Sequence, residues 1–189
     1  MGFHHVAFAT NDTAATHDFY TRVMGFELVK VVAAPTPSHT GFAKHMFYAT
    51  GPIDGSGEPG MIAFWEIHDP KVGDAHEVDL NKAAGFPNWV NHIAFDAPTL
   101  DDLNAHRARW QECGYVVLEL DHGFCRSIYV NDPSGNTVEF CCTTRAFTQD
   151  ELDHAAATVL DPAPELDETE PTATVWEPAG APAAAPASV

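Results

Sequence analysis

The sequence predicts an α+β protein built from two consecutive modules, each with the element order β-α-β-β-β. This order of elements occurs twice within the first 148 residues, and His5-Val6-Ala7-Phe8 is matched by His92-Ile93-Ala94-Phe95, 87 positions later. The distance from the histidine to the glycine expected to end the next helix is also similar, 20 residues to Gly25 and 22 to Gly114. Duplication of one module explains these matches more simply than two unrelated strands with the same short apolar pattern.

Module one is expected to span residues 3–67. Residues 3–9 alternate and are rich in aromatic and β-branched side chains, which is typical of a strand. Asn11 or Asp12 can cap a helix that runs to about Val23, with Gly25 in the stop position. Three further strands are predicted over residues 26–32, 43–49 and 61–67, because Pro, Ser and Gly interrupt the segments between them.

Module two is expected to span residues 91–144 and repeats the same order. A strand over residues 91–96 leads to Thr99 and Asp102, which can form a capping arrangement for a helix that ends at Gly114. Strands are then predicted over residues 115–120, 125–130 and 137–143. The polar linker over residues 68–90 is too long for a simple turn, and loops of this length are often lids or substrate walls.

The composition is strongly acidic, with 27 Asp plus Glu against 9 Lys plus Arg and a net charge of −18 at neutral pH. Half of this charge belongs to the stretch after Arg145, which has nine acidic residues and neither Lys nor Arg. Nucleic acids and anionic membranes both reward clusters of Lys and Arg. We therefore expect neither as a partner.

Residues 1–148 form the predicted domain, and residues 149–189 an acidic tail rich in Pro and Ala. Thr148 and Glu151 match a capping box, so one short helix is expected there. Beyond about Leu160 the composition cannot bury enough apolar surface to offset the entropy of ordering, which predicts disorder.

The four cysteines, Cys113, Cys125, Cys141 and Cys142, show no C-x-x-C spacing, and no signal-type segment precedes them. A reducing, cytoplasmic location is therefore expected. No apolar run is long enough to span a bilayer.

The candidate chemistry is centred on His5, His92 and Glu139. The two histidines occupy equivalent positions of the repeat, so a pseudo-twofold axis between the modules would direct both imidazoles to one cavity. Glu139 lies between Val138 and Phe140 on the last predicted strand, where a carboxylate is costly unless it is paired or bound to a metal. Two His and one carboxylate suit non-haem Fe(II), and also Mn, Zn or Ni. Ordinary strand histidines and a solvated Glu139 are the alternative.

The paired modules, the two His-apolar-Ala-Phe strands and the run from Asp132 to Glu139, Asp-Pro-Ser-Gly-Asn-Thr-Val-Glu, together resemble the vicinal oxygen chelate superfamily. This superfamily includes glyoxalase I, extradiol dioxygenases, fosfomycin-modifying enzymes and bleomycin-resistance proteins. The resemblance covers about residues 3–144. It implies the paired-module fold, a divalent metal and a homodimer.

A narrower resemblance favours one activity. The spacing of His122, Tyr129, Asp132-Pro133-Ser134-Gly135 and Glu139 is similar to the extradiol dioxygenase signature, although Leu120 departs from it. This resemblance implies that Glu139 is an iron ligand, that Tyr129 hydrogen-bonds a metal-bound substrate oxygen, and that His122 assists. The expected function is an Fe(II) extradiol-type dioxygenase that acts on a catechol-like aromatic substrate with O2.

Two alternatives stay open. Glyoxalase-type members add a fourth ligand from the last strand of module one, and Glu66 lies on that strand. Counting from Gly60 and Gly135, however, places Phe64 opposite Glu139 in the repeat. Ligation by Glu66 would favour a metal-dependent isomerase or lyase, whereas Phe64 in that position would leave three ligands. The other alternative is a metal-free protein that binds a small molecule and confers resistance.

Overall fold

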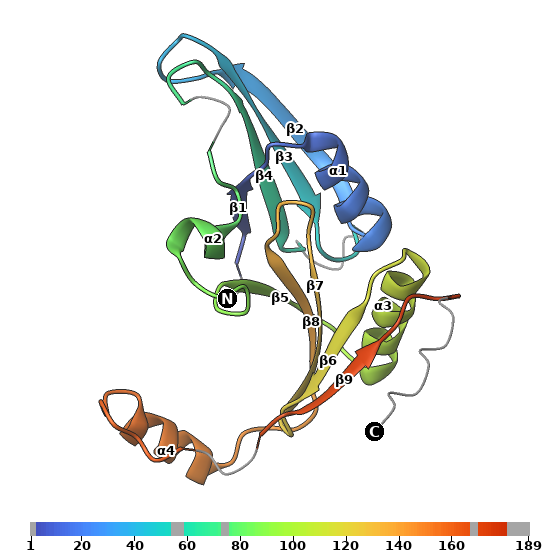
Figure 1. Cartoon of the computed structure of the whole chain (residues 1–189), viewed down its shortest axis with the longest axis vertical. Coiled ribbons are helices and arrows are strands. Elements are labelled where there is room, and N and C mark those ends of the chain that lie inside the picture. The colour runs from blue at the N-terminus through green and yellow to red at the C-terminus, as the bar shows by residue number, and fades with distance from the viewer. Residues whose placement is uncertain (1–2, 54–58, 73–75, 167–169, 181–189) are drawn as a thin grey trace, which may run out of the picture. The chain divides into compact units, whose positions relative to one another are not determined.

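The computed structural model describes residues 3–53, 59–72, 76–166 and 170–180 (Figure 1). The chain divides into two compact units, Met1–Ile93 with Asn131–Val138, and Ala94–Val130 with Glu139–Val189. Among the described residues, no helix is long and apolar enough to cross a membrane.

The first unit is built on a sheet with the strand order β1-β4-β3-β2. Its strands are β1 (His5–Ala9), β2 (Glu27–Pro35), β3 (Phe42–Ala49) and β4 (Met61–His68). β1 pairs with β4 in parallel, and β3 is antiparallel to both β2 and β4. Helix α1 (Thr13–Asp18) continues into a π-helical turn, η1 (Phe19–Val23). Asp12 caps α1 by accepting a hydrogen bond from the Ala15 amide, as the sequence predicts.

Aromatic packing between η1 and one face of this sheet forms the core of the first unit. The Tyr20 ring lies 4.5 Å from the Phe64 ring and 6.1 Å from the Tyr48 ring, and each of the three side chains is 1% exposed. The Tyr20 hydroxyl donates a 3.0 Å hydrogen bond to the Asp132 carboxylate, which is also buried. The turn around Asp132 is thereby fixed to the η1 segment.

A short helix, α2 (Leu80–Ala84), lies in the linker, where the sequence predicts a loop. Asp79 caps its first turn, and Gly85 ends it in the left-handed conformation with φ 75°. Asn81 is 1% exposed and makes three hydrogen bonds of 2.8 Å, to the carbonyls of Asn88 and Asn91 and from the Asn91 amide. This buried amide holds the linker in place just before the next strand.

The second sheet has the strand order β5-β8-β7-β6-β9. Its strands are β5 (His92–Asp96), β6 (Val117–Asp121), β7 (Cys125–Asn131), β8 (Thr137–Thr143) and β9 (Thr172–Trp176). Helix α3 (Leu100–Glu112) packs on one face, where the Phe140 ring stacks on His106 at 3.6 Å and lies 5.5 Å from Trp110. The predicted capping box of Thr99 and Asp102 is present, and Leu103 and Trp110 are buried.

The two modules repeat the same hydrogen bond at the end of their first strand. The Thr10 amide donates to the Trp65 carbonyl at 2.9 Å, and the Ala97 amide donates to the Cys141 carbonyl at 2.8 Å. Thr10 and Ala97 are equivalent in the repeat, so Trp65 and Cys141 are equivalent as well. The predicted α+β class and the paired β-α-β-β-β modules are confirmed.

The C-terminal stretch differs in part from the predicted disorder. Helix α4 (Gln149–Thr158) begins at the predicted capping box of Thr148 and Glu151, and it buries none of its own residues. Beyond it, β9 pairs antiparallel with β6, as Figure 1 shows for the red strand. The indole of Trp176 donates to Glu119 at 2.8 Å, and the Arg107 guanidinium lies 3.9 Å from the ring centre. The contacts of Trp176 therefore hold β9 in place, although the surrounding sequence is acidic and rich in Pro.

Candidate functional site

His5 lies on the face of the first sheet that is opposite to the η1 core. The register pairs His5 with Met61 and Ala9 with Trp65, so His5 shares its face with Trp65. His45 pairs with Trp65 on the next strand, and the two rings stack at 3.8 Å. The ring of Phe47 lies 5.4 Å from that of His5. His5 therefore stands in an aromatic setting on this face.

Two further imidazoles lie close to His5. His4 Nδ1 is 2.8 Å from His5 Nδ1, and the His45 ring is 6.1 Å from the His5 ring. Burial, and then the nearby His5, lower the pKa of His45, which favours its neutral form. Sequence reasoning missed His45, because only the register between β3 and β4 brings it to this face.

Glu66 lies on the other face of the same strand. It pairs in register with Lys44 and forms an ion pair with that side chain. His68 Nε2 is 3.1 Å from the second carboxylate oxygen. Burial acts to raise the pKa of Glu66, but the hydrogen bonds from Lys44 and His68 outweigh it, and the pKa is lowered. The Glu66 carboxylate is thus ion-paired with Lys44 on the core side of the sheet.

Glu66, the expected fourth ligand, does not share the face of His5. His5 and Glu66 project from opposite faces of the sheet. Because Trp65 is equivalent to Cys141, the position equivalent to Glu139 is Ala63, two residues before Trp65. Counting from the glycines therefore missed the register by one residue, and neither Phe64 nor Glu66 occupies the ligand position.

His92 is exposed at the start of β5. Its Nδ1 lies 3.1 Å from the Trp89 carbonyl oxygen, which can only accept a hydrogen bond. The Nδ1 atom therefore carries a proton. Histidine ligands commonly donate the other ring N–H to a carbonyl in this way, which orients the ring toward its metal.

Glu139 and Tyr129 face each other across β7 and β8. Two hydrogen bonds set the register of this hairpin, from the Asp132 amide to the Asn136 carbonyl and from the Thr144 amide to the Phe124 carbonyl, both 2.9 Å. This register pairs Tyr129 with Glu139 and Ser127 with Cys141. Side chains that alternate along the two strands then share one face, which we call the Glu139 face: Cys125, Ser127, Tyr129, Glu139 and Cys141.

The Glu139 face is opposite to α3 and largely buried. Glu139 is 5% exposed, Cys125 6% and Ser127 1%. Burial, together with the neighbouring Glu139 carboxylate, raises the pKa of Tyr129 to about 12. The phenol is therefore a hydrogen-bond donor at neutral pH, placed beside the carboxylate that the sequence selects as a ligand.

His122 lies at the turn between β6 and β7, where its amide donates to the Cys125 carbonyl at 2.9 Å. Leu118 is the residue that pairs with Tyr129, so His122 is four residues, or about 13 Å, further along the strand. The structure therefore does not bring His122 and Tyr129 together. Sequence spacing alone cannot reveal this, because both residues lie near one hairpin.

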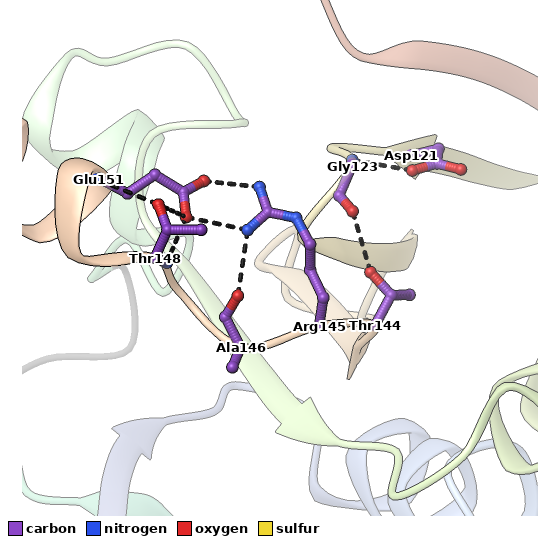
Figure 2. A network of polar contacts seen from close by, with 7 residues as sticks. All are labelled: Asp121, Gly123, Thr144, Arg145, Ala146, Thr148 and Glu151. Carbon is purple, nitrogen blue, oxygen red and sulfur yellow. Dashed lines mark hydrogen bonds and ion pairs between the residues drawn. The ribbon is translucent and has the colours of Figure 1, made fainter.

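His122 instead lines a groove of about 960 Å³ between the β6–β7 turn and the segment around α4. Figure 2 shows the polar contacts on one side of this groove. The Arg145 guanidinium donates to Glu151 at 2.6 and 2.9 Å, and the Thr144 hydroxyl donates to the Gly123 carbonyl at 3.1 Å. These contacts join the β6–β7 turn to the start of α4.

The predicted ligands fit a divalent metal by their donor chemistry. His5 and His92 carry imidazole nitrogens, and Glu139 carries a buried carboxylate. Two imidazoles and one carboxylate suit Fe(II) and its neighbours in the first transition series. Within the described residues, no group of three or more His, Cys, Asp or Glu side chains forms a ready metal site.

Comparison with known families agrees with the fold and the element order. The family described as "Glyoxalase/Bleomycin resistance protein/Dioxygenase superfamily" matches residues 2–140. The chain belongs to this superfamily.

Individual relatives are more distant. A "Probable trivalent organoarsenical cleaving enzyme" of Bacillus subtilis (strain 168) is 23% identical over 167 residues, which cover 86% of this chain and 94% of the relative. The crystal structure of a glyoxylase/bleomycin resistance protein/dioxygenase domain from Frankia sp. EAN1pec has a TM-score of 0.55 at 15% identity, and covers 76% of this chain and 98% of that one. The fosfomycin resistance protein FosX of Listeria monocytogenes, solved with Mn(II) and sulfate, has a TM-score of 0.47 at 18% identity, with 80% and 96% covered.

Proposed function

We propose that the chain is a divalent-metal enzyme of this superfamily, with His5, His92 and Glu139 as the ligands and Fe(II) as the metal, and that it oxygenates a small aromatic substrate with O2. The observation that carries the proposal is the pairing of Tyr129 with Glu139 on one buried face. A phenol beside a metal-binding carboxylate can donate to an anionic substrate oxygen at that metal. A homodimer remains part of the proposal.

The number of ligands favours an oxygenase over a glyoxalase-type isomerase or lyase. Glu66 is turned to the core side of its sheet and paired with Lys44, and Ala63 occupies the position equivalent to Glu139. Three protein ligands leave coordination positions for both a bidentate substrate and O2, which is the chemistry that Fe(II) supplies in a facial site.

The residues of this chain contribute binding and orientation. Tyr129, held protonated with a pKa of about 12, donates a hydrogen bond beside Glu139. The hydrogen bond from His92 Nδ1 to the Trp89 carbonyl orients the imidazole ring, which would hold the metal. His122 lies too far along the strand to contact the same substrate oxygen as Tyr129. We therefore place His122 in the groove at the β6–β7 turn and not beside Tyr129.

A second candidate function is cleavage of a trivalent organoarsenical. The Bacillus subtilis relative supports it, since that protein bears this activity in its name and the match covers most of both chains. This candidate shares the metal ligands with the first and differs in the substrate.

The test is anaerobic reconstitution of the full-length protein with Fe(II), followed by O2 uptake with a panel of catechols and with phenylarsine oxide. We expect one metal ion per chain and uptake with one substrate class. Glu139→Gln should lose the metal, whereas Glu66→Gln, the matched control on the other face, should keep it. Bound iron without uptake refutes the oxygenase. Activity with Ni(II) or Co(II) in the absence of O2 supports the isomerase or lyase, and purified protein that binds its ligand without metal supports the resistance protein.

A further inference from the structure

Two thiols lie side by side on the Glu139 face. The register pairs Ser127 with Cys141, and Cys125 is two residues before Ser127 on the same strand face. Cys125 and Cys141 are therefore diagonal neighbours across the hairpin, a position from which the side chains of adjacent strands touch. The pKa of Cys125 is raised to about 11, first by burial and then by the neighbouring Cys141 thiol.

The adjacent pair in the sequence, Cys141 and Cys142, does not form such a site. Successive residues of a strand point to opposite faces, and Cys142 pairs in register with Arg126 on the α3 side. The Sγ of Cys142 contacts the Thr143 carbonyl at 3.8 Å. The thiol that accompanies Cys141 is thus Cys125, 16 positions earlier in the chain.

Ser127 lies between the two thiols and adds a polar atom to the site. Its side chain is 1% exposed, and its hydroxyl interacts with the Cys125 thiol and the Tyr129 phenol. Cys141 is only partly buried, which leaves one thiol accessible.

We propose that Cys125 and Cys141 form a dithiol site that holds a trivalent organoarsenical on the Glu139 face. In the binding step, an arsenical R–As(OH)2 reacts with two thiols: two As–S bonds form, two As–O bonds break, and two waters leave with the thiol protons. The oxidation state of arsenic does not change. The inference deepens the second candidate function, because it places the arsenic on the same face as Glu139.

A trivalent organoarsenical fits this site better than a soft divalent metal. Zn²⁺ and similar ions require about four protein ligands, whereas this site offers two thiols. An organoarsenical already carries one carbon substituent and needs only two thiols. Its dithiol adduct is neutral, so burial on this face imposes no charge penalty, in contrast to a metal held by thiolates.

The test uses the reduced full-length protein without metal and with phenylarsine oxide as the probe. We expect a one-to-one adduct by intact mass spectrometry, with Cys125 and Cys141 both protected from alkylation in the peptide map. A dithiol such as 2,3-dimercaptopropanol should remove the probe, whereas a monothiol at the same thiol concentration should not. Loss of one thiol should weaken binding by about 100-fold, because the second As–S bond is intramolecular.

Cys125→Ser and Cys141→Ser should each show this loss, and Cys142→Ser and Cys113→Ser are the matched controls that should bind like the parent. Protection of Cys141 together with Cys142, or unchanged binding by Cys125→Ser, overturns the proposal. The protection map requires no variant, so it decides the question even if a serine variant fails to fold. Neither Fe(II) nor O2 is present in this experiment. Failure of arsenical binding and failure of the proposed catalysis are therefore separate results.

Discussion

Replacement of Tyr20 by Phe tests how the Asp132 turn is held. The Tyr20 hydroxyl donates to one oxygen of Asp132 at 3.0 Å, while the other oxygen accepts from the amides of Ser134 and Asn136 at 2.9 Å. The Phe ring keeps the packing on Phe64 and removes only the hydroxyl. One carboxylate oxygen of a buried group then loses its donor.

The expected cost is about 2 kcal/mol, within the range for a hydrogen bond to a charged group that leaves its partner buried. At a urea dependence of about 2 kcal/mol per molar, this lowers the urea midpoint by about 1 M. Tyr48→Phe is the matched control. Its hydroxyl lies 3.2 Å from His17 Nδ1, a contact to an imidazole and not to a carboxylate, so about 0.5–1 kcal/mol is expected.

The cost should also depend on pH. Burial raises the pKa of Asp132, and the Tyr20 hydrogen bond acts in the opposite direction. A carboxyl group with a raised folded-state pKa favours the folded state fully below its unfolded pKa, and this stability is lost as the pH rises through the folded pKa. Removal of Tyr20 raises that folded pKa further. The penalty should therefore be larger at mildly alkaline pH than at mildly acidic pH.

Urea unfolding at both pH values, followed by tryptophan fluorescence and far-ultraviolet circular dichroism, measures this difference. Equal shifts for Tyr20→Phe and Tyr48→Phe, or a Tyr20→Phe penalty that grows toward acidic pH, would refute the reasoning.

Three further predictions concern the other sites. Glu66→Gln should leave Fe(II) content by plasma emission unchanged, whereas loss of iron would return Glu66 to the ligand set. Trp176→Ala removes the hydrogen bond to Glu119 and the contact with Arg107, at a cost of about 2 kcal/mol, so amide exchange in β6 should accelerate about 30-fold; unchanged exchange would show that β9 is held by its backbone pairing. Asn81→Ala removes three buried hydrogen bonds and should lower stability by about 3 kcal/mol in calorimetry, and a change under 1 kcal/mol would contradict this anchor.

Local signals explain why most of the fold could be predicted. The capping box of Thr99 and Asp102 and the cap at Asp12 act over three residues, so they are visible in a short window. The repeated His-apolar-Ala-Phe pattern of two strands indicates the two modules. Helix α2 was missed because its stability comes from the buried Asn81, whose partners lie beyond the helix.

The candidate site could be predicted only in part, because strand faces depend on long-range register. Counting from the glycines placed Phe64 where the structure places Ala63, one residue earlier and on the other face, and the hydrogen bonds of Thr10 and Ala97 resolve this shift. The partnership of Cys125 with Cys141 likewise depends on the hairpin register. The short Asp132–Asn136 turn could have supplied that register, since it leaves few ways to pair the strands.

The pairing of β9 with β6 has a consequence for how the molecule behaves in solution. β6 would otherwise end the sheet with a row of unpaired amides and carbonyls, which is a template for the addition of a strand from another molecule. β9 becomes the edge strand in its place, and Pro171, Glu177 and Pro178 beside it are residue types that discourage the addition of a further strand. β9 lies in the acidic, Pro-rich C-terminal stretch. A stretch of this composition is often removed when a shorter protein is prepared. A chain cut before Thr172 would keep its candidate ligands and expose the β6 edge without this protection.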